Sequence, residues 1–253
     1  MPKHERPVCG WQISGSLPPL DFSDAYTVLA GSNHSPLVVH KEILCRGSDY
    51  FVAACSMQWQ RGDGKTIVAE AVQPCIMRIY VRWKYTAELV IEPEDLVFTK
   101  DLAEELAIDL GDEDGYADLA SAELRTLLQL YVACDVFLDN AAKNAVITEI
   151  IRLVHPTDED CFVESHDRII SDSKEFICYV WENTGPSSQL RYFLLDTCLA
   201  EFAPAQFANF AHAEDYPAGF VEALMMEVRK GVKEWLWTKK QRVCAYHDHS
   251  GVD

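Results

Sequence analysis

The 253-residue sequence has no run of 18 or more apolar residues. A membrane-spanning helix needs about 20 predominantly apolar residues, so the sequence predicts no membrane span. The amino end, residues 1–16, is polar and lacks the apolar stretch of a secretory signal. We therefore expect a protein of the cytoplasm, the nucleus or both.

Basic residues are also scarce, because 22 Lys and Arg stand against 40 Asp and Glu, for a net charge of −18. Proteins that bind nucleic acid need clustered Lys and Arg against the phosphates. We therefore expect no direct nucleic-acid partner and no membrane partner.

Motifs of catalysis are absent as well. The sequence has no GxSxG nucleophile turn, no glycine-rich phosphate loop and no HExxH zinc motif. A Cys–His nucleophile pair forms only in three dimensions, so the sequence leaves that alternative open. We predict that the protein is not an enzyme and has no cofactor.

One acidic cluster, residues 112–115, has the composition of a calcium loop. With Gly115 at position six of an EF-hand, Leu110 and Ser121 would occupy the first and last positions, where acidic ligands are required. We therefore predict a solvated acidic turn between Gly111 and Gly115.

The cysteines also indicate no metal site. Nine are present without a repeated CxxC spacing, and Cys134, Cys178 and Cys198 lie in apolar stretches typical of reduced packing residues. Cys244, His247 and His249 lie together in a short tail, where a closed zinc site is not expected.

The amino-terminal half of the chain begins with strand patterns. Residues 25–30 and 35–39 are rich in Val, Leu, Tyr and Thr, and the four residues between them are turn formers. This predicts a β-hairpin. Residues 65–68, after a glycine-rich turn, predict a third strand.

Helical spacing follows the hairpin. Two short helices are predicted after Lys41, with Ser48 as the amino-terminal cap of the second. Pro74 is placed to begin a longer amphipathic helix that ends at Tyr85-Thr86. Its apolar stripe comprises Ile76, Ile79, Tyr80 and Trp83, and we expect Tyr50, Phe51, Trp83 and Tyr85 in the core.

This order of elements resembles a BTB/POZ domain over residues 22–155, and is most similar to divergent BTB proteins of filamentous fungi. The resemblance implies an α+β fold with a small sheet capped by helices, and a protein-interaction module without an active site. His40 is then expected to satisfy backbone groups rather than to act as a base or ligand. The residues that match the family pattern, and so the expected scaffold, are Asp24, His40, Lys41, Leu44, Ser48, Phe51, Tyr85 and Thr86.

The remainder is predicted to be helical. Apolar spacing indicates helices over residues 124–138 and 146–154, which would close the BTB fold, and over 173–182, 188–202 and 217–238. Residues 92–118 carry eleven Asp or Glu against Lys100 alone, which indicates an acidic insertion.

We therefore divide the chain into an amino-terminal mobile arm, a BTB/POZ-like domain, a helical region similar in position to BACK-type extensions, and a tail. The arm can add a strand to a partner subunit in the family. A basic run after Arg229 could contact the acidic insertion, although a solvated helix end explains it as well. The boundaries are 1–21, 22–155, 156–243 and 244–253.

The resemblance implies a scaffold or adaptor that binds itself, as a possible homodimer, or another protein. Alternatives are a substrate adaptor of a cullin-RING ubiquitin ligase and a transcriptional co-regulator. Cullin adaptors of the family usually place a hydrophobic residue, any residue and Glu after the second short helix. Here that place reads Trp59-Gln60-Arg61, which are the candidate partner-binding residues, and Arg61 disfavours a cullin.

Overall fold

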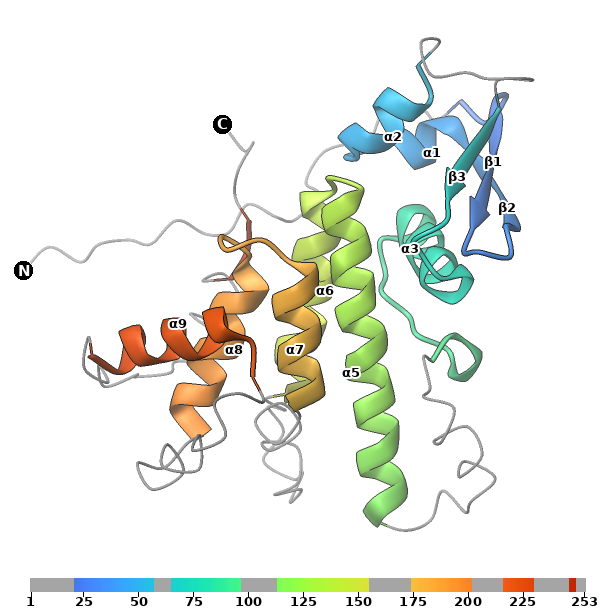
Figure 1. Cartoon of the computed structure of the whole chain (residues 1–253). Helices are drawn as coiled ribbons and strands as arrows, with labels where there is room; N and C mark the ends of the chain where they lie inside the picture. Colours follow the sequence, from blue (N-terminus) through green and yellow to red (C-terminus); the bar gives the residue numbers. More distant parts are fainter. Residues whose placement is uncertain are drawn as a thin grey trace, which may run out of the picture.

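The structure is a computed structural model, in which a three-stranded sheet with its helices lies on one side of a central helix pair and further helices lie on the other (Figure 1). The described residues are 21–56, 65–96, 113–154, 174–201, 216–229 and 246–248.

The sheet has the strand order β2-β1-β3. Strands β1 (Ala25–Ala30) and β2 (Ser35–His40) form the predicted antiparallel hairpin, and β3 (Thr66–Ala69) pairs with β1 in parallel. The hairpin turn begins at Gly31, whose φ of 70° favours glycine, and a Cβ there would lie 2.9 Å from Pro74 Cδ. The turn therefore lies tightly against the start of the next long helix.

Two short helices, α1 (Lys41–Cys45) and α2 (Asp49–Ala54), follow the hairpin as predicted. Ser48 caps α2, because its hydroxyl accepts a hydrogen bond from the Phe51 backbone N–H at 3.3 Å. Helix α3 (Pro74–Thr86) also has its predicted bounds, with Pro74 in its first turn.

The inward face of α3 differs from the prediction at its carboxyl end. Ile76, Ile79 and Tyr80 are buried, but Trp83 is only half-buried and Tyr85 is 42% exposed. Lys84 is buried in their place, because its ammonium group has a buried carboxylate partner, Asp139, to pair with. The expectation that Tyr85 belongs to the core was therefore wrong. Tyr50, also expected there, is half-buried and packs against the core.

Helices α5 (Glu113–Val136) and α6 (Asn140–Val154) form the central pair and correspond to the two predicted closing helices. Helix α5 begins eleven residues earlier than its apolar stripe, so Gly115 is helical and the predicted turn at that residue was wrong. A helix of this length accommodates one glycine at a modest local cost of about 1 kcal/mol.

The carboxyl-terminal region contains α7 (Lys174–Asn183), α8 (Gln189–Glu201) and α9 (Ala218–Arg229), close to the predicted helices over the described residues. The predicted continuation of the last helix over 230–238 lies outside the described residues. Residues 246–248 return to pack between α6 and α8, where Tyr246 and His247 are buried. That part of the expected tail is therefore ordered against the helices.

A single cluster of buried apolar side chains runs from the sheet through α5 and α6 to α8 and α9. Leu44 and Phe51 lie within it, as do Cys134 and Cys198, which confirms their packing role. The α+β fold class, with a small sheet followed by a helical region, is confirmed. The proposed domain boundaries stay a prediction.

Candidate functional site

The expected scaffold residues lie at three junctions between elements. At the first, the Asp24 backbone C=O accepts a hydrogen bond from the Lys41 backbone N–H at 2.9 Å, which ties the start of α1 to the end of the sheet. The Asp24 carboxylate lies 2.7 Å from Lys65 Nζ and 3.9 Å from Lys41 Nζ. All three side chains are substantially exposed, and such ion pairs contribute at most about 1 kcal/mol.

The second junction joins the end of β2 to the end of α3. The His40 backbone N–H donates to the Tyr85 hydroxyl at 3.1 Å, and His40 Nδ1 lies 2.6 Å from the same oxygen. Phe22 packs edge-on against the His40 ring, with 4.9 Å between ring centroids. The imidazole was expected to satisfy backbone groups, but its partner is the Tyr85 side chain.

The Thr86 side chain ends α3 by hydrogen bonding to backbone groups of neighbouring residues. Its hydroxyl donates to the Arg82 C=O at 3.0 Å and accepts from the Glu88 N–H at 3.1 Å. Ala87 then adopts a left-handed φ of 58°. The predicted terminus at Tyr85-Thr86 is thus capped by the Thr86 hydroxyl and by a left-handed residue.

The third junction is a buried polar cluster around Asp139, at the start of α6. One carboxylate oxygen accepts from the Ala142 N–H at 3.0 Å, and the other accepts from Tyr80 Oη at 2.9 Å and Lys84 Nζ at 2.8 Å. Lys84 also donates to the Arg46 C=O, and the Ser48 hydroxyl donates to the Phe137 C=O at 2.6 Å. The cluster therefore holds the α1–α2 segment, α3 and the α5–α6 loop together.

Burial lowers the pKa of Lys84, and the Asp139 charge opposes that effect. Burial also raises the pKa of Tyr80, and the Asp139 charge adds to that rise. Both groups are shut away from solvent, so we assign the cluster a structural role. The sequence signals that could have revealed it are Lys84 inside the apolar repeat of α3 and Asp139 at a helix amino terminus.

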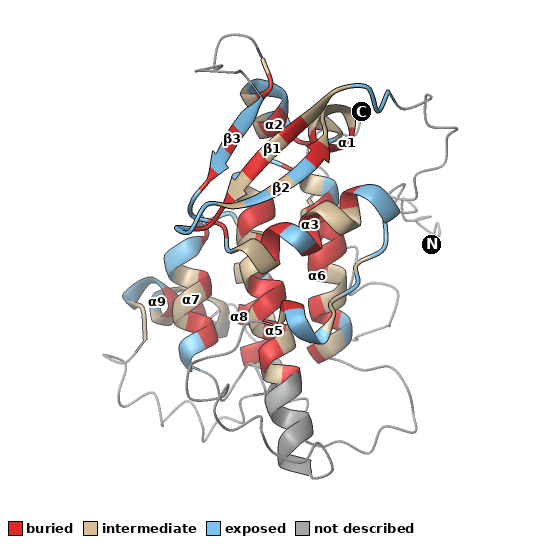
Figure 2. Cartoon of the chain, turned by 90° about the vertical axis from the view of Figure 1, so that its right-hand side faces the viewer, coloured by how far each residue is buried: buried red, intermediate tan, exposed pale blue. Residues whose placement is uncertain are grey.

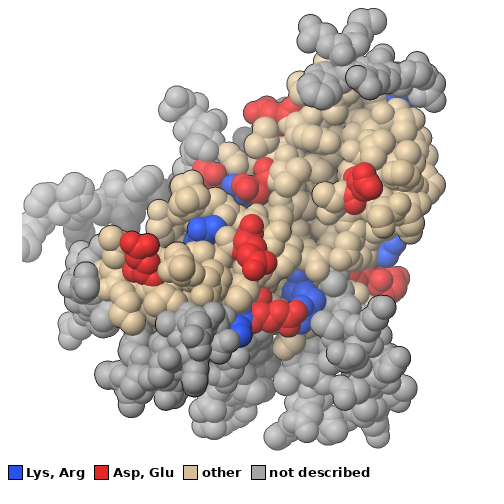
Figure 3. Space-filling model, in the orientation of Figure 1, with Lys and Arg blue, Asp and Glu red and all other residues tan. Residues whose placement is uncertain are grey.

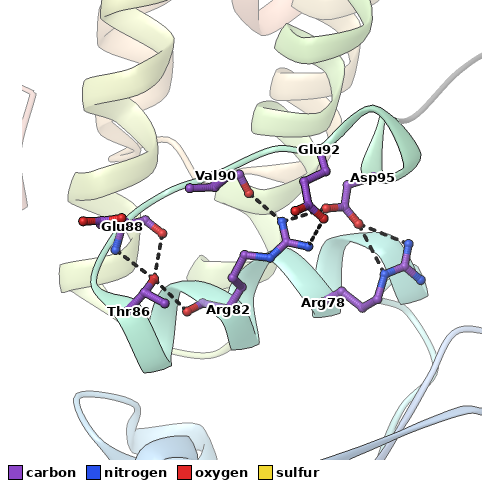
Figure 4. A network of polar contacts seen from close by, with 7 residues as sticks. All are labelled: Arg78, Arg82, Thr86, Glu88, Val90, Glu92 and Asp95. Atoms are coloured by element: carbon purple, nitrogen blue, oxygen red, sulfur yellow. Dashed lines mark hydrogen bonds and ion pairs between the residues drawn. The ribbon is translucent and has the colours of Figure 1, made fainter.

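The segment predicted to be an acidic insertion begins with residues that fold back on α3 (Figure 4). The Asp95 carboxylate is fully buried and accepts from Arg78 at 3.1 Å and from Arg82 at 2.9 Å. Arg82 also donates to the Val90 C=O at 2.9 Å and to Glu92 at 2.7 Å. The first acidic residues are therefore structural anchors, because they neutralise two arginines of α3. Residues 97–112 of the insertion lie outside the described residues.

One face of the sheet is directed away from the helices (Figure 2). Alternate residues of the three strands point outward there, and Val38 and Val68 are 73% and 51% exposed. We name this surface the outer sheet face. It comprises Ala25, Thr27, Leu29, Pro36, Val38, His40, Thr66 and Val68.

A depression of about 570 Å³ lies between the start of α3, α5 and α7. Among the described residues that line it, the titratable groups are Tyr179 and Glu182, and burial raises the pKa of Tyr179. Neither is a nucleophile with an adjacent base, so this depression offers no catalytic arrangement of the usual kind.

Charged residues are dispersed over the face seen in Figure 3, without a basic patch among the described atoms. No three His, Cys, Asp or Glu side chains of the described segments lie close enough to hold a metal ion. None of the described helices is long and apolar enough to cross a membrane.

The candidate residues Trp59, Gln60 and Arg61 lie outside the described residues, as do Cys244 and His249.

Comparison with protein families matches residues 19–110 to the BTB/POZ domain. No curated protein gives a significant match. The matched range contains the hairpin, the two short helices, β3 and α3, which are the elements on which the resemblance depends. This chain therefore carries a BTB/POZ domain, which is a protein–protein interaction module.

Proposed function

We propose that this protein is a non-catalytic scaffold or adaptor that acts by holding other protein chains, and that its first partner is a second copy of itself. The helical region from α7 onward would serve as a BACK-like extension that presents a further surface. We expect it to act in the cytoplasm or the nucleus.

The outer sheet face is the observation that carries this proposal. None of its eight residues is Asp, Glu, Lys or Arg, although the whole chain has a net charge of −18 with His neutral. Two copies that approach through acidic surfaces repel each other, whereas an uncharged face avoids that repulsion. The exposed Val38 and Val68 side chains would each contribute about 1.5–3 kcal/mol if they were fully buried in an interface.

The sheet edges support association in a second way. In the strand order β2-β1-β3, one edge of β2 and one edge of β3 have no neighbouring strand among the described residues. Free strand edges present backbone donors and acceptors that a chain in extended conformation can pair with.

The test is the oligomeric state of the full chain by multi-angle light scattering over a range of concentrations. We expect the natural chain to form a dimer, and Val68→Asp to weaken it. A symmetric interface contains each changed residue twice, so a loss of at least about 3 kcal/mol, or roughly a hundredfold in affinity, is expected.

Val136→Asp is the matched control, because Val136 is 52% exposed, much like Val68, but lies at the end of α5. Thermal melts establish that both variants remain folded. A monomeric natural chain, or a dimer that both substitutions weaken equally, would contradict the proposal that the outer sheet face is the interface.

Two narrower roles remain as alternatives of the same class. A cullin-RING adaptor is disfavoured by Arg61, which replaces the acid that the family usually has there. A transcriptional co-regulator would be recruited through the BTB surface. Affinity purification of the tagged full chain with mass spectrometry separates these roles, because it asks whether a cullin, a chromatin factor or the chain itself is retained.

A further inference from the structure

Two cysteines of the BTB region meet at the ends of neighbouring helices. Cys45 is the last residue of α1, and Cys55 caps the carboxyl end of α2. Both interact with one backbone oxygen, because Cys45 Sγ lies 3.5 Å from the Phe51 C=O and the Cys55 N–H donates to it at 2.9 Å. This shared oxygen places the two cysteines side by side where α1 and α2 end.

We propose that Cys45 and Cys55 form a redox-active dithiol, which an oxidant of the peroxide class converts into a disulfide between α1 and α2. This modification site is independent of the outer sheet face. It requires one partly exposed thiol that reacts first and one neighbouring thiol that resolves the product.

The surroundings of the two thiols assign these roles. Cys45 is half-buried, whereas Cys55 is 4% exposed. The hydrogen bond from Cys55 lowers the pKa of Cys45 to about 7, and the positive charges of Lys41 and Lys84 help while burial opposes. The same hydrogen bond, together with burial and the Cys45 charge, raises the pKa of Cys55. Cys45 is therefore the attacking thiolate and Cys55 the resolving thiol.

The reaction balances with hydrogen peroxide as the oxidant. The Cys45 thiolate attacks one peroxide oxygen, the O–O bond breaks, and hydroxide leaves and takes up a proton as water. The Cys55 sulfur then attacks the Cys45 sulfenic acid, so that the S–S bond forms and a second water leaves with the Cys55 proton. Oxidation of Cys45 removes the negative charge of its thiolate. That charge is one of the influences that raise the pKa of Cys55, so Cys55 then loses its proton more readily.

Equimolar hydrogen peroxide on the full chain, followed by alkylation and tryptic digestion, tests this directly. Trypsin separates the two cysteines into the peptides Glu42–Arg46 and Gly47–Arg61. We expect these peptides to be joined, with the loss of two hydrogens, and separated again by dithiothreitol. In Cys55→Ser, Cys45 sulfenic acid should accumulate and be trapped by dimedone.

Cys75 provides the matched control, because it is also half-buried but burial raises its pKa. Iodoacetamide should modify Cys45 roughly fivefold to fiftyfold faster than Cys75 at neutral pH. The Cys45 rate should have a midpoint at about pH 7. This comparison uses the natural chain, so it holds even if Cys55→Ser fails to fold. Equal rates for the two thiols, or peroxide oxidation of Cys45 without linkage to Gly47–Arg61, would overturn the proposal.

Discussion

Among single residues, Lys84 and Asp139 form an ion pair that is almost completely buried. Their side chains are 3% and 0% exposed. A buried pair of this kind contributes little compared with an apolar replacement of both partners, but the loss of one partner leaves an isolated charge in the core. The pair therefore enforces one arrangement of α3 against the α5–α6 loop.

Lys84→Met is expected to reduce the free energy of unfolding by about 3–5 kcal/mol, because Asp139 would keep a buried charge without its ammonium partner. Urea unfolding measures the loss. Lys143→Met is the control, since its two carboxylate partners, Asp135 and Asp248, keep contact with solvent at 44% and 27% exposure, and it should cost about 1 kcal/mol or less. Adding Asp139→Asn to Lys84→Met should recover part of the loss. Similar losses for the two lysines would contradict this account.

The second prediction for a single residue concerns Arg61 and the cullin. If the BTB surface docks as in the family's adaptors, Arg61 meets a position that usually accepts an acid, which costs on the order of 2–5 kcal/mol. We expect weak or absent cullin binding by the natural chain and a gain of roughly thirtyfold or more in Arg61→Glu. A purified titration measures both, and tight binding by the natural chain would show that the motif is misplaced on Trp59 to Arg61.

At the scale of elements, α5 and α6 carry two carboxylates whose ionisation opposes folding. Burial, with a contribution from the Glu149 charge, raises the pKa of Glu123. Burial likewise raises the pKa of Glu149, although Arg152 lies 2.8 Å away and opposes that shift. A raised pKa means that the folded state binds the proton more tightly than the unfolded state. Protonated Glu123 and Glu149 therefore stabilise the folded state at pH values below their ordinary pKa of 4.5. This contribution is lost as the pH rises through their raised pKa values in the folded state.

Glu123→Gln should therefore raise the melting temperature at neutral pH, because the amide removes a charge that the fold keeps partly buried. The gain should vanish at pH values below the ordinary 4.5. Thermal melts across this range provide the measurement.

Glu175→Gln is the matched control, because hydrogen bonds from Arg125 lower the pKa of Glu175. The same chemical change should there reduce stability at neutral pH, and the loss should fade as the pH falls below 4.5. Effects of the same sign for the two variants would show that the pairing with Arg125 and the burial of Glu123 do not decide these energies.

At the scale of the whole molecule, the tail joins two helices that are far apart in sequence. The Asn144 side chain of α6 donates to the Asp248 C=O at 2.9 Å and accepts from the Asp248 N–H at 2.7 Å. Tyr246 donates to Asp196 of α8 at 2.7 Å and packs edge-on against Phe193. His247 Nε2 lies 3.0 Å from the Thr148 hydroxyl. Residues 246–248 therefore connect α6 with α8.

Tyr246→Ala should cost roughly 3–5 kcal/mol of stability, since it removes a buried aromatic ring from this contact. Tyr246→Phe keeps the ring and removes only the hydrogen bond to Asp196, for a cost of about 0.5–1.5 kcal/mol. Calorimetry of the full chain measures both. An unchanged melting temperature in Tyr246→Ala would mean that the tail leaves the helices in solution.

Local signals predicted much of the fold because they act over a few residues. The hairpin of β1 and β2, the Ser48 cap and the bounds of α3 were confirmed. The polar junctions of the candidate site were missed, because Lys84 and Asp139 are 55 residues apart in sequence and become partners only when α3 packs against the α5–α6 loop.

The sequence by itself determined the alternation of strands and helices, the acidic net charge and the resemblance to the BTB/POZ family, since these follow from residue type and spacing. Only the tertiary structure decided which polar residues are buried and which apolar residues are exposed. Lys84 is buried because it pairs with Asp139 of a distant segment, whereas Tyr85 lies at the surface, where its hydroxyl bonds with His40. Such contacts depend on how the elements pack, and spacing along one helix does not specify them.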